Sequence, residues 1–338
     1  MHMPPNVSVV VPCFNEEKTI LKLLDAVRAQ AYPSTCLQVV IADGLSTDGT
    51  RQLVGQFRDL HPELDVLIVD NEKRTIPAAL NAGIASASGE IIVRLDAHSM
   101  PYEDYVQKVV RLLEEGQGDN VGGVWEIRAG SESWIAESIA AAASHPLGAG
   151  DALYRLRPRA GEVDTVPFGS FKRSLIERIG RFDESLLSNE DYEFNARLRK
   201  AGGVVWLDPA VRSVYFARPS LGALARQYWR YGFWKLRMLR RYPETLRWRQ
   251  ALPPLLLASL LVMSVLSLWW TVARYAFFIE LAVYAFALVL AGLQLTMKNR
   301  RLSLLLGFPA AVTVMHFSWA AGFIWSLFTS LPPDQQHG

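Results

Sequence analysis

The sequence predicts an α/β fold with a mostly parallel sheet, followed by a membrane region. Two observations support this prediction. As far as Leu207, short apolar runs rich in β-branched residues alternate with segments of helical spacing, which is the pattern of βαβ units. Beyond Arg249, three long stretches carry few or no charges, and each is long enough to cross a hydrocarbon core of about 30 Å.

Four strands alternate with helices in the first part of the chain. Buried strands are indicated by runs of Val and Ile, and helices by apolar residues that recur at helical spacing. The strands are expected at Val7–Val11, Val39–Ala42, Val66–Val69 and Ile91–Leu95, and the helices at Asn15–Arg28, after the turn cluster Asp43–Thr50, and at Ile76–Ala87.

The second part of the soluble region continues with less regular spacing. A Gly-rich segment, His145–Asp151, interrupts it and predicts a mobile loop. Helices are expected at Tyr102–Glu115, Trp134–Ala143, Arg173–Ile179 and Asn189–Ala201, and strands at Val121–Ile127, Val163–Phe171 and Val204–Leu207.

The distribution of charge divides the chain near Ala217. Residues 1–217 carry 22 Lys and Arg against 30 Asp and Glu, whereas residues 218–338 carry 13 against 3. Within residues 218–250, nine basic side chains alternate with aromatic ones beside a single acid, Glu244. We therefore expect a cytosolic α/β domain over 1–217, helices on an anionic membrane surface over 218–250, and a transmembrane region over 251–338.

Three spans are predicted, at about 251–273, 275–297 and 302–331. The N-terminus has no cleavable signal pattern, and the loop with Lys298, Arg300 and Arg301 is basic. The positive-inside rule then places the front domain and this loop in the cytosol and the C-terminus outside, in the cytoplasmic membrane. Glu280 and His316 lie inside predicted spans and receive no assigned role. Cys13 and Cys36 imply no disulfide framework, and both are expected to act as small hydrophobes.

The segment Ile91–Met100 changes abruptly from an apolar strand to the polar residues Asp96, His98 and Ser99. In open α/β sheets, ligands collect at the carboxyl ends of strands, so this segment is a candidate metal site. The alternative is a turn or helix cap, because Asp and Ser often begin helices and Pro101 stands where one would start.

Four strand-end motifs occur in order: Pro12-Cys13-Phe14-Asn15-Glu16, Asp43–Thr50, Asp96-Ala97-His98, and Glu190-Asp191. In combination they resemble the inverting nucleotide-sugar glycosyltransferases of family 2, which have the GT-A fold. The resemblance covers about Val7–Val214. The Arg94–His98 segment looks most like that of succinoglycan-type glucosyltransferases of bacterial polysaccharide assembly.

This resemblance implies roles for the donor-side residues. It assigns nucleotide binding to Pro12, Asn15, Glu16, Asp43, Arg94 and Asp96. A nucleoside diphosphate leaves with developing negative charge, which a divalent cation neutralises, so Mn²⁺ or Mg²⁺ is expected on Asp96. The family usually has a second Asp where this chain has His98, and an imidazole favours Mn²⁺ as a ligand or contacts the diphosphate instead. Asp48 remains open, since it also suits a turn.

The acceptor-side residues follow from the same resemblance. Inversion needs a base that removes the acceptor proton, and the family pattern gives this role to Asp191, with Glu190 supporting it or binding acceptor. The alternative is that both acids simply favour the dipole of the following helix. The segment Gln227-Tyr228-Trp229-Arg230-Tyr231 resembles the Gln-x-x-Arg-Trp element of membrane glycosyltransferases, so Gln227 and Arg230 are candidate acceptor contacts. The alternative is a role at the membrane surface alone.

The sequence therefore predicts an enzyme that transfers a hexose, with UDP-glucose as the expected donor, to a polyprenyl-linked saccharide in exopolysaccharide assembly. Membrane lipids and other assembly proteins are expected partners, and nucleic acid is not. One alternative is a polyprenyl-phosphate sugar transferase, whose acceptor is already ionised. Another is a catalytically silent nucleotide-sugar-binding scaffold. A dehydrogenase is disfavoured because no G-x-G-x-x-G follows the first strand.

Overall fold

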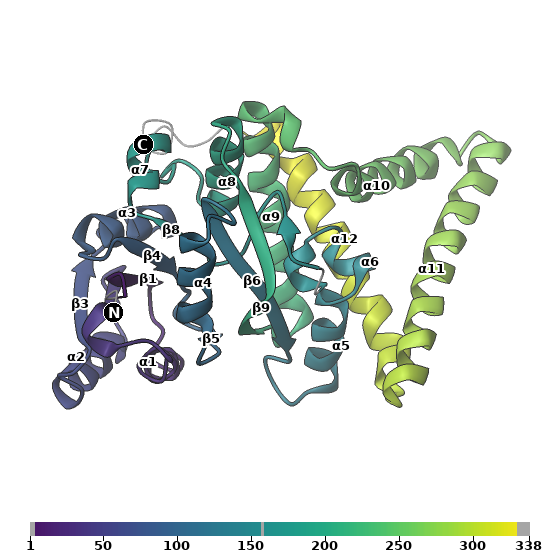
Figure 1. Cartoon of the computed structure of the whole chain (residues 1–338). Coiled ribbons are helices and arrows are strands. Elements are labelled where there is room, and N and C mark those ends of the chain that lie inside the picture. The colour runs from purple at the N-terminus through teal and green to yellow at the C-terminus, as the bar shows by residue number, and fades with distance from the viewer. Residues whose placement is uncertain (1–3, 157–158, 330–338) are drawn as a thin grey trace. The chain divides into compact units, whose positions relative to one another are not determined.

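The computed structural model describes residues 4–156 and 159–329, and their contacts divide the chain into two parts (Figure 1). Within the described residues, the sheet unit holds 4–126 and 153–215, and the helical unit holds 127–152 and 216–329. One division of these units falls after Tyr215, and the domain boundary expected near Ala217 stays a prediction. The helical unit also takes Ile127–Ala152, a segment expected to belong to the catalytic domain.

The first half of the sheet is parallel, as predicted. Its strands lie in the order β3-β2-β1-β4, with Val9 paired to Val39 on one side and to Val93 on the other. The helix α3 packs on β1, β2 and β3, and Gly83 is needed there because a Cβ would lie 2.5 Å from Val10. The bounds are β1 Val7–Cys13, α1 Ile20–Arg28, β2 Leu37–Asp43, α2 Thr50–Leu60, β3 Asp65–Asp70, α3 Ile76–Ser86 and β4 Ile91–Arg94.

The second half of the sheet is antiparallel, and it differs from the sequence prediction. Of the range Val163–Phe171, expected to form a strand and turn, only Ser170 and Phe171 belong to a strand, β8, and β7 ends before the range at Glu162. β7 and β8 pair with different neighbours, and the last strand runs to Phe216 instead of ending at Leu207. This last strand continues through Pro209, which donates no ladder hydrogen bond, and pairs with β5 at Val214. The bounds are β5 Met100–Pro101, β6 Asn120–Arg128, β7 Gly161–Glu162, β8 Ser170–Lys172 and β9 Val205–Phe216.

The remaining helices of the sheet unit follow the predictions to within a few residues. They are α4 Tyr105–Glu114, α7 Ser174–Ile179 and α8 Glu190–Lys200. The inner side of α8 carries Phe194 and Leu198, which join a buried cluster with Val10, Ile92 and Phe171 from the sheet. This packing fixes the first turn of α8 relative to the strands. Cys13 is buried, and its burial next to Asp43 raises the pKa of the thiol, consistent with the predicted hydrophobic role.

The helical unit is built around its last long helix. A cluster of buried residues joins Ile139 of α5, Leu224 of α9 and Leu288 of α11 to Phe308 and Met315 of α12. The bounds are α5 Trp134–Ala143, α6 Pro146–Ala149, α9 Leu221–Arg241, α10 Trp248–Leu266, α11 Thr271–Asn299 and α12 Ser303–Phe328. Helices α10, α11 and α12 are long and apolar enough to cross a membrane, in agreement with the three predicted stretches. Positions 330 and 331 of the third predicted span lie outside the described residues.

Polar side chains inside these apolar helices have hydrogen-bond partners. Glu280 accepts from the Ser259 hydroxyl at 2.9 Å. The two ring nitrogens of His316 lie 3.1 Å from the Tyr284 hydroxyl and 2.7 Å from the Leu147 carbonyl. The second contact attaches α6 to α12, so the segment predicted as a mobile Gly-rich loop contains a short helix held in place.

Candidate active site

The loops that follow β1 and β2 are joined by hydrogen bonds at the carboxyl ends of the strands. The Ser46 hydroxyl accepts from the backbone N–H of Asn15 at 2.8 Å, and the Asn15 amide oxygen accepts from the N–H of Thr47 at 2.9 Å. The N–H of Glu16 donates to the Thr50 hydroxyl at 2.8 Å. The structure therefore brings the first two predicted motifs together at one edge of the sheet. Pro12, the last residue but one of β1, is half-buried beneath them.

Asp43 is a buried carboxylate at this edge that accepts hydrogen bonds from the loop after β2. Its side chain is fully buried and accepts from the Ser46 N–H at 2.9 Å and from Arg51 at 3.2 Å, and Arg51 also reaches Asp70. A carboxylate enclosed in this way stabilises the loop. A direct contact between Asp43 and the base of a nucleotide would require its hydrogen bonds to Ser46 and Arg51 to break. Asp48 accepts from the Thr50 N–H, as expected for a turn residue.

Phe14 is a residue of this edge that the sequence reasoning did not single out. It stands between β1 and Asn15 and is 47% exposed. The guanidinium of Arg74 lies 6.0 Å from the ring centre. The feature of the sequence that could have identified Phe14 is the presence of an aromatic residue within a polar turn after a strand. An exposed flat ring at a strand end offers a stacking surface.

Arg94 joins the third motif to the fourth. Its side chain is buried, and its Nη2 atom lies 2.9 Å from Glu190 and 3.4 Å from Asp96. Its Nε and Nη1 atoms are buried without a hydrogen-bond partner among the described residues. The ion pairs bring the end of β4 next to the first turn of α8. Because Arg94 and Glu190 are both buried, their positions favour a supporting role over direct contact with nucleotide or acceptor.

Asp191 stands next to this ion-pair group in the first turn of α8. Its burial and the adjacent charge of Glu190 raise the pKa of Asp191 to about 6, while the positive charge of Arg94 limits the rise. One carboxylate oxygen accepts from the backbone N–H of Tyr192 at 2.8 Å. A carboxylate with such a pKa is ionised near neutral pH and is a better proton acceptor than an ordinary exposed Asp.

His98 lies close to the first loop. Its Nδ1 atom is 3.0 Å from a carboxylate oxygen of Glu16, and both side chains are partly exposed. A carboxylate on one ring nitrogen is the arrangement that orients a histidine for binding a metal through the other. The described residues contain no group of three His, Cys, Asp or Glu that would hold a cation by themselves. A cation on Asp96 and His98 would take its remaining ligands from a diphosphate and water, and this site stays a prediction.

The predicted acceptor residues of the helical unit lie on α9. Gln227 is buried, and its amide donates to the Tyr231 hydroxyl at 2.9 Å, whereas Arg230 is exposed. The two residues line one groove of the helical unit together with Trp229. Their predicted contact with an acceptor stays a prediction.

Sequence comparison identifies relatives along nearly the whole chain. The chain is 30% identical over 319 residues to the succinoglycan biosynthesis protein ExoA of Rhizobium meliloti, with 93% of each protein covered. It is 27% identical to a dolichyl N-acetyl-α-D-glucosaminyl phosphate 3-β-D-2,3-diacetamido-2,3-dideoxy-β-D-glucuronosyltransferase of Methanococcus voltae, with 95% of this chain and 97% of the relative covered.

Structural comparison supports the GT-A-like fold. The mannosyltransferase PcManGT of Pyrobaculum calidifontis, solved with GDP-Man and Mn²⁺, superposes with a TM-score of 0.62 at 24% identity, over 96% of this chain and 87% of that one. The family model described as glycosyl transferase family 2 matches residues 8–180, which is half of the chain. The protein is a family 2 glycosyltransferase with candidate membrane-spanning helices after its catalytic fold.

Proposed function

We propose that this glycosyltransferase moves a hexose, with glucose from UDP-glucose as the first candidate, to a polyprenyl-linked saccharide at the cytosolic face of a membrane, with inversion. The observation that carries the proposal is the pair of ion pairs that Arg94 forms with Asp96 and Glu190. These ion pairs join the end of β4 to the first turn of α8, where Asp191 stands. Two curated relatives support the lipid-linked acceptor, because one is a succinoglycan biosynthesis protein and the other acts on a dolichyl-linked phosphate sugar.

The proposed reaction is a single displacement with Asp191 as the base. The acceptor hydroxyl oxygen forms a bond to the anomeric carbon as the bond from that carbon to the diphosphate oxygen breaks. The hydroxyl proton passes to the carboxylate of Asp191, and the nucleoside diphosphate leaves. The raised pKa of Asp191 suits this role, because a base works best when its pKa lies near the working pH.

Asp96 and His98 would hold Mn²⁺ or Mg²⁺ against the diphosphate of the donor. The cation would neutralise the negative charge that develops on the leaving group. Glu16 supports this proposal through His98, whose ring it orients. The structural neighbour solved with Mn²⁺ and GDP-Man also supports a divalent cation.

The nucleotide would lie on the loops that Asn15, Ser46 and Thr47 hold together. Phe14 is proposed to stack on the base, and Pro12 and Asn15 to shape the turn beneath it. Asp43 and Arg94 would act indirectly, Asp43 by bracing the loop and Arg94 by placing Glu190 and Asp96.

Charge and contacts bear on the orientation in the membrane in different ways. The basic α9 and the basic loop between α11 and α12 are proposed to lie on the cytosolic side. However, Arg237 and Arg240 of α9 donate to the carbonyls of Thr329 and Ser326 at the end of α12, at 3.2 and 3.3 Å. These contacts favour a position of Thr329 on the same side as α9, in place of the outside location expected from three spans.

Cysteine labelling distinguishes these two orientations. In a chain with Cys13 and Cys36 replaced by Ala, Thr329→Cys is expected to resist a membrane-impermeant maleimide in intact cells and to react after permeabilisation. A cysteine at Arg301 serves as the cytosolic reference. Labelling of Thr329→Cys before permeabilisation would instead support three crossings.

A polyprenyl-phosphate sugar transferase is the second candidate. Its acceptor phosphate is already ionised and needs no strong base, so the raised pKa of the half-buried Asp191 favours the saccharide acceptor. The deciding experiment is incubation of membranes containing the protein with UDP-, GDP- and dTDP-sugars, followed by mass spectrometry of the lipids. A gain of one hexose on a lipid-linked saccharide is expected with a UDP-sugar. A hexose found only on polyprenyl phosphate would select the second candidate, and nucleotide binding without any product would select the silent scaffold.

A further inference from the structure

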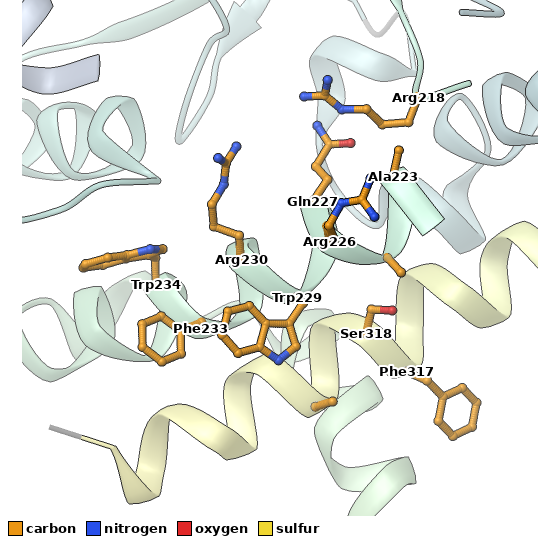
Figure 2. Close-up of a pocket in the computed structure, with 12 residues that line it drawn as sticks. Arg218, Ala223, Arg226, Gln227, Trp229, Arg230, Phe233, Trp234, Phe317 and Ser318 are labelled. Carbon is orange, nitrogen blue, oxygen red and sulfur yellow. The ribbon is translucent and has the colours of Figure 1, made fainter. Parts of the chain in front are cut away.

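A groove runs between α9 and α12 within the helical unit (Figure 2). Its volume is about 1060 Å³, which matches the upper end of the range for small-molecule sites. We call it the α9–α12 groove. Its lining includes Arg218, Arg226, Gln227, Trp229, Arg230, Phe233, Trp234, Phe317 and Ser318.

Three arginines of the groove, Arg218, Arg226 and Arg230, form no ion pair with the described acids of the helical unit. Other basic residues of α9 do have partners, since Lys235 and Arg237 donate to backbone carbonyls. Figure 2 shows the side chains of Arg218 and Arg230 extending to the same side of α9. Guanidinium groups without counter-charge can bind an anion, and their paired N–H donors suit phosphate oxygens.

Aromatic rings form the other part of the lining. The rings of Trp229 and Phe233 stack with their centres 5.2 Å apart, and Trp229 is 39% exposed. Phe317 and Ser318 belong to α12, a helix apolar enough to enter a membrane. The groove therefore combines a cationic end with an apolar wall, which suits a ligand that has an anionic head and a hydrocarbon tail.

The two helices of the groove are fixed at a close crossing. A Cβ on Gly232 would lie 2.0 Å from the Trp319 carbonyl oxygen, and a Cβ on Gly322 would lie 2.0 Å from that of Trp229. Only glycine permits this approach of the backbones. The crossing holds the arginines and the rings of α9 in a constant position relative to α12, so the groove is preformed.

We propose that the α9–α12 groove binds the diphosphate and first isoprene units of a polyprenyl diphosphate, the lipid part of the acceptor. This inference rests on the proposed function and extends it to a defined site. The diphosphate would contact Arg218, Arg226 and Arg230, and the prenyl chain would lie against Trp229 and Phe233. The three positive charges match a diphosphate ester better than a single phosphodiester, which carries one negative charge.

The test is equilibrium binding of farnesyl diphosphate to the full chain in phosphatidylcholine nanodiscs. The double variant Arg226→Gln/Arg230→Gln is expected to bind it at least roughly tenfold more weakly, because each lost charge-assisted contact has a strong effect. Trp229→Ala is expected to weaken farnesyl diphosphate binding and to leave the weaker binding of inorganic diphosphate unchanged. Arg241→Gln, an exposed arginine of α9 outside the groove, is the matched control and should bind like the unaltered chain.

Two outcomes would overturn the inference. One is equal affinity for farnesyl diphosphate in the double variant and the control. The other is full competition by phosphatidylglycerol in the nanodisc, which would make the groove a phospholipid site.

Binding of UDP, measured in the same samples, separates this inference from the proposed function. If the unaltered chain binds no UDP and transfers no sugar, the proposed function fails. If it does both and the groove variants are unaffected, only the groove assignment fails.

Discussion

The arginines beside the candidate active site of the sheet unit and those of the α9–α12 groove in the helical unit have different surroundings. In the sheet unit, Arg94 is buried and joined to Glu190 and Asp96, and Arg51 joins Asp43 to Asp70. In the helical unit, Arg226 and Arg230 are exposed and form no ion pair with its described acids. A paired cation places its acids and is part of the fold, whereas an unpaired cation contributes little to the fold and is available to a ligand. The comparison predicts that arginine substitutions in the two units affect different properties.

The largest expected effect is on the chemical step in the sheet unit. Asp191→Asn keeps the size of the side chain and removes the proposed base, so the turnover number should fall by about 10²–10⁴-fold with little change in UDP affinity. The measurement is hexose transfer to a lipid-linked saccharide, with Glu177→Gln on the exposed side of α7 as the control. Undiminished transfer in folded Asp191→Asn protein would remove the assigned base.

The pH dependence of the unaltered enzyme gives an independent reading of Asp191. The proposed base must be ionised, and its pKa is raised to about 6. Transfer should therefore be nearly constant above this pH and fall as the pH drops through it, approaching tenfold per pH unit below. A decline that begins only near pH 4 would indicate an unperturbed carboxylate.

Arg94→Met should have the next largest effect, and on stability as well as activity. The change leaves Glu190 buried next to Asp191 without its counter-charge, which typically lowers the free energy of unfolding by about 3–5 kcal/mol. The double variant Arg94→Met/Glu190→Gln should recover much of that loss, because no buried charge then remains unpaired. Thermal unfolding of the purified variants measures both effects. Equal stability of Arg94→Met and the unaltered chain would contradict the inference that the ion-paired Arg94 is part of the fold.

The sequence was sufficient for the parallel half of the fold, whereas the roles given to the site residues stay predictions. Continuous apolar runs in strands and helical apolar patterns report burial directly, so β1 to β4 were predicted to within two residues at either end. The antiparallel half was harder, because short strands such as β7 and β8 exist only through partners far along the chain. In the site, the motifs predicted which strand ends meet. The enclosure of Asp43, the central place of Arg94 and the exposed ring of Phe14 depend on tertiary packing, which residue type alone does not reveal.

Glu16→Gln is expected to have a smaller effect than Arg94→Met, and it tests how the proposed metal site is supported. The substitution weakens the contact that orients His98, so Mn²⁺ affinity should fall by roughly 10–100-fold, the usual range for such supporting carboxylates. Mn²⁺ titration of transfer activity after treatment with EDTA measures this, together with Mn²⁺ binding in the presence of UDP. Activity that survives EDTA in the unaltered enzyme would exclude the cation at Asp96 and His98.

The smallest expected effect is on the stability of the helical unit when its arginines are changed. Arg226→Gln and Arg230→Gln remove exposed charges without counter-ions, so each should change the free energy of unfolding by no more than about 0.5 kcal/mol. Thermal unfolding in the same nanodiscs used for the binding test provides the measurement. Removing mutual repulsion between neighbouring cations would raise stability slightly, whereas removing a structural ion pair would lower it. A clear loss in either variant would show that these arginines hold the helices together, and the distinction between paired and unpaired cations would no longer separate fold from function.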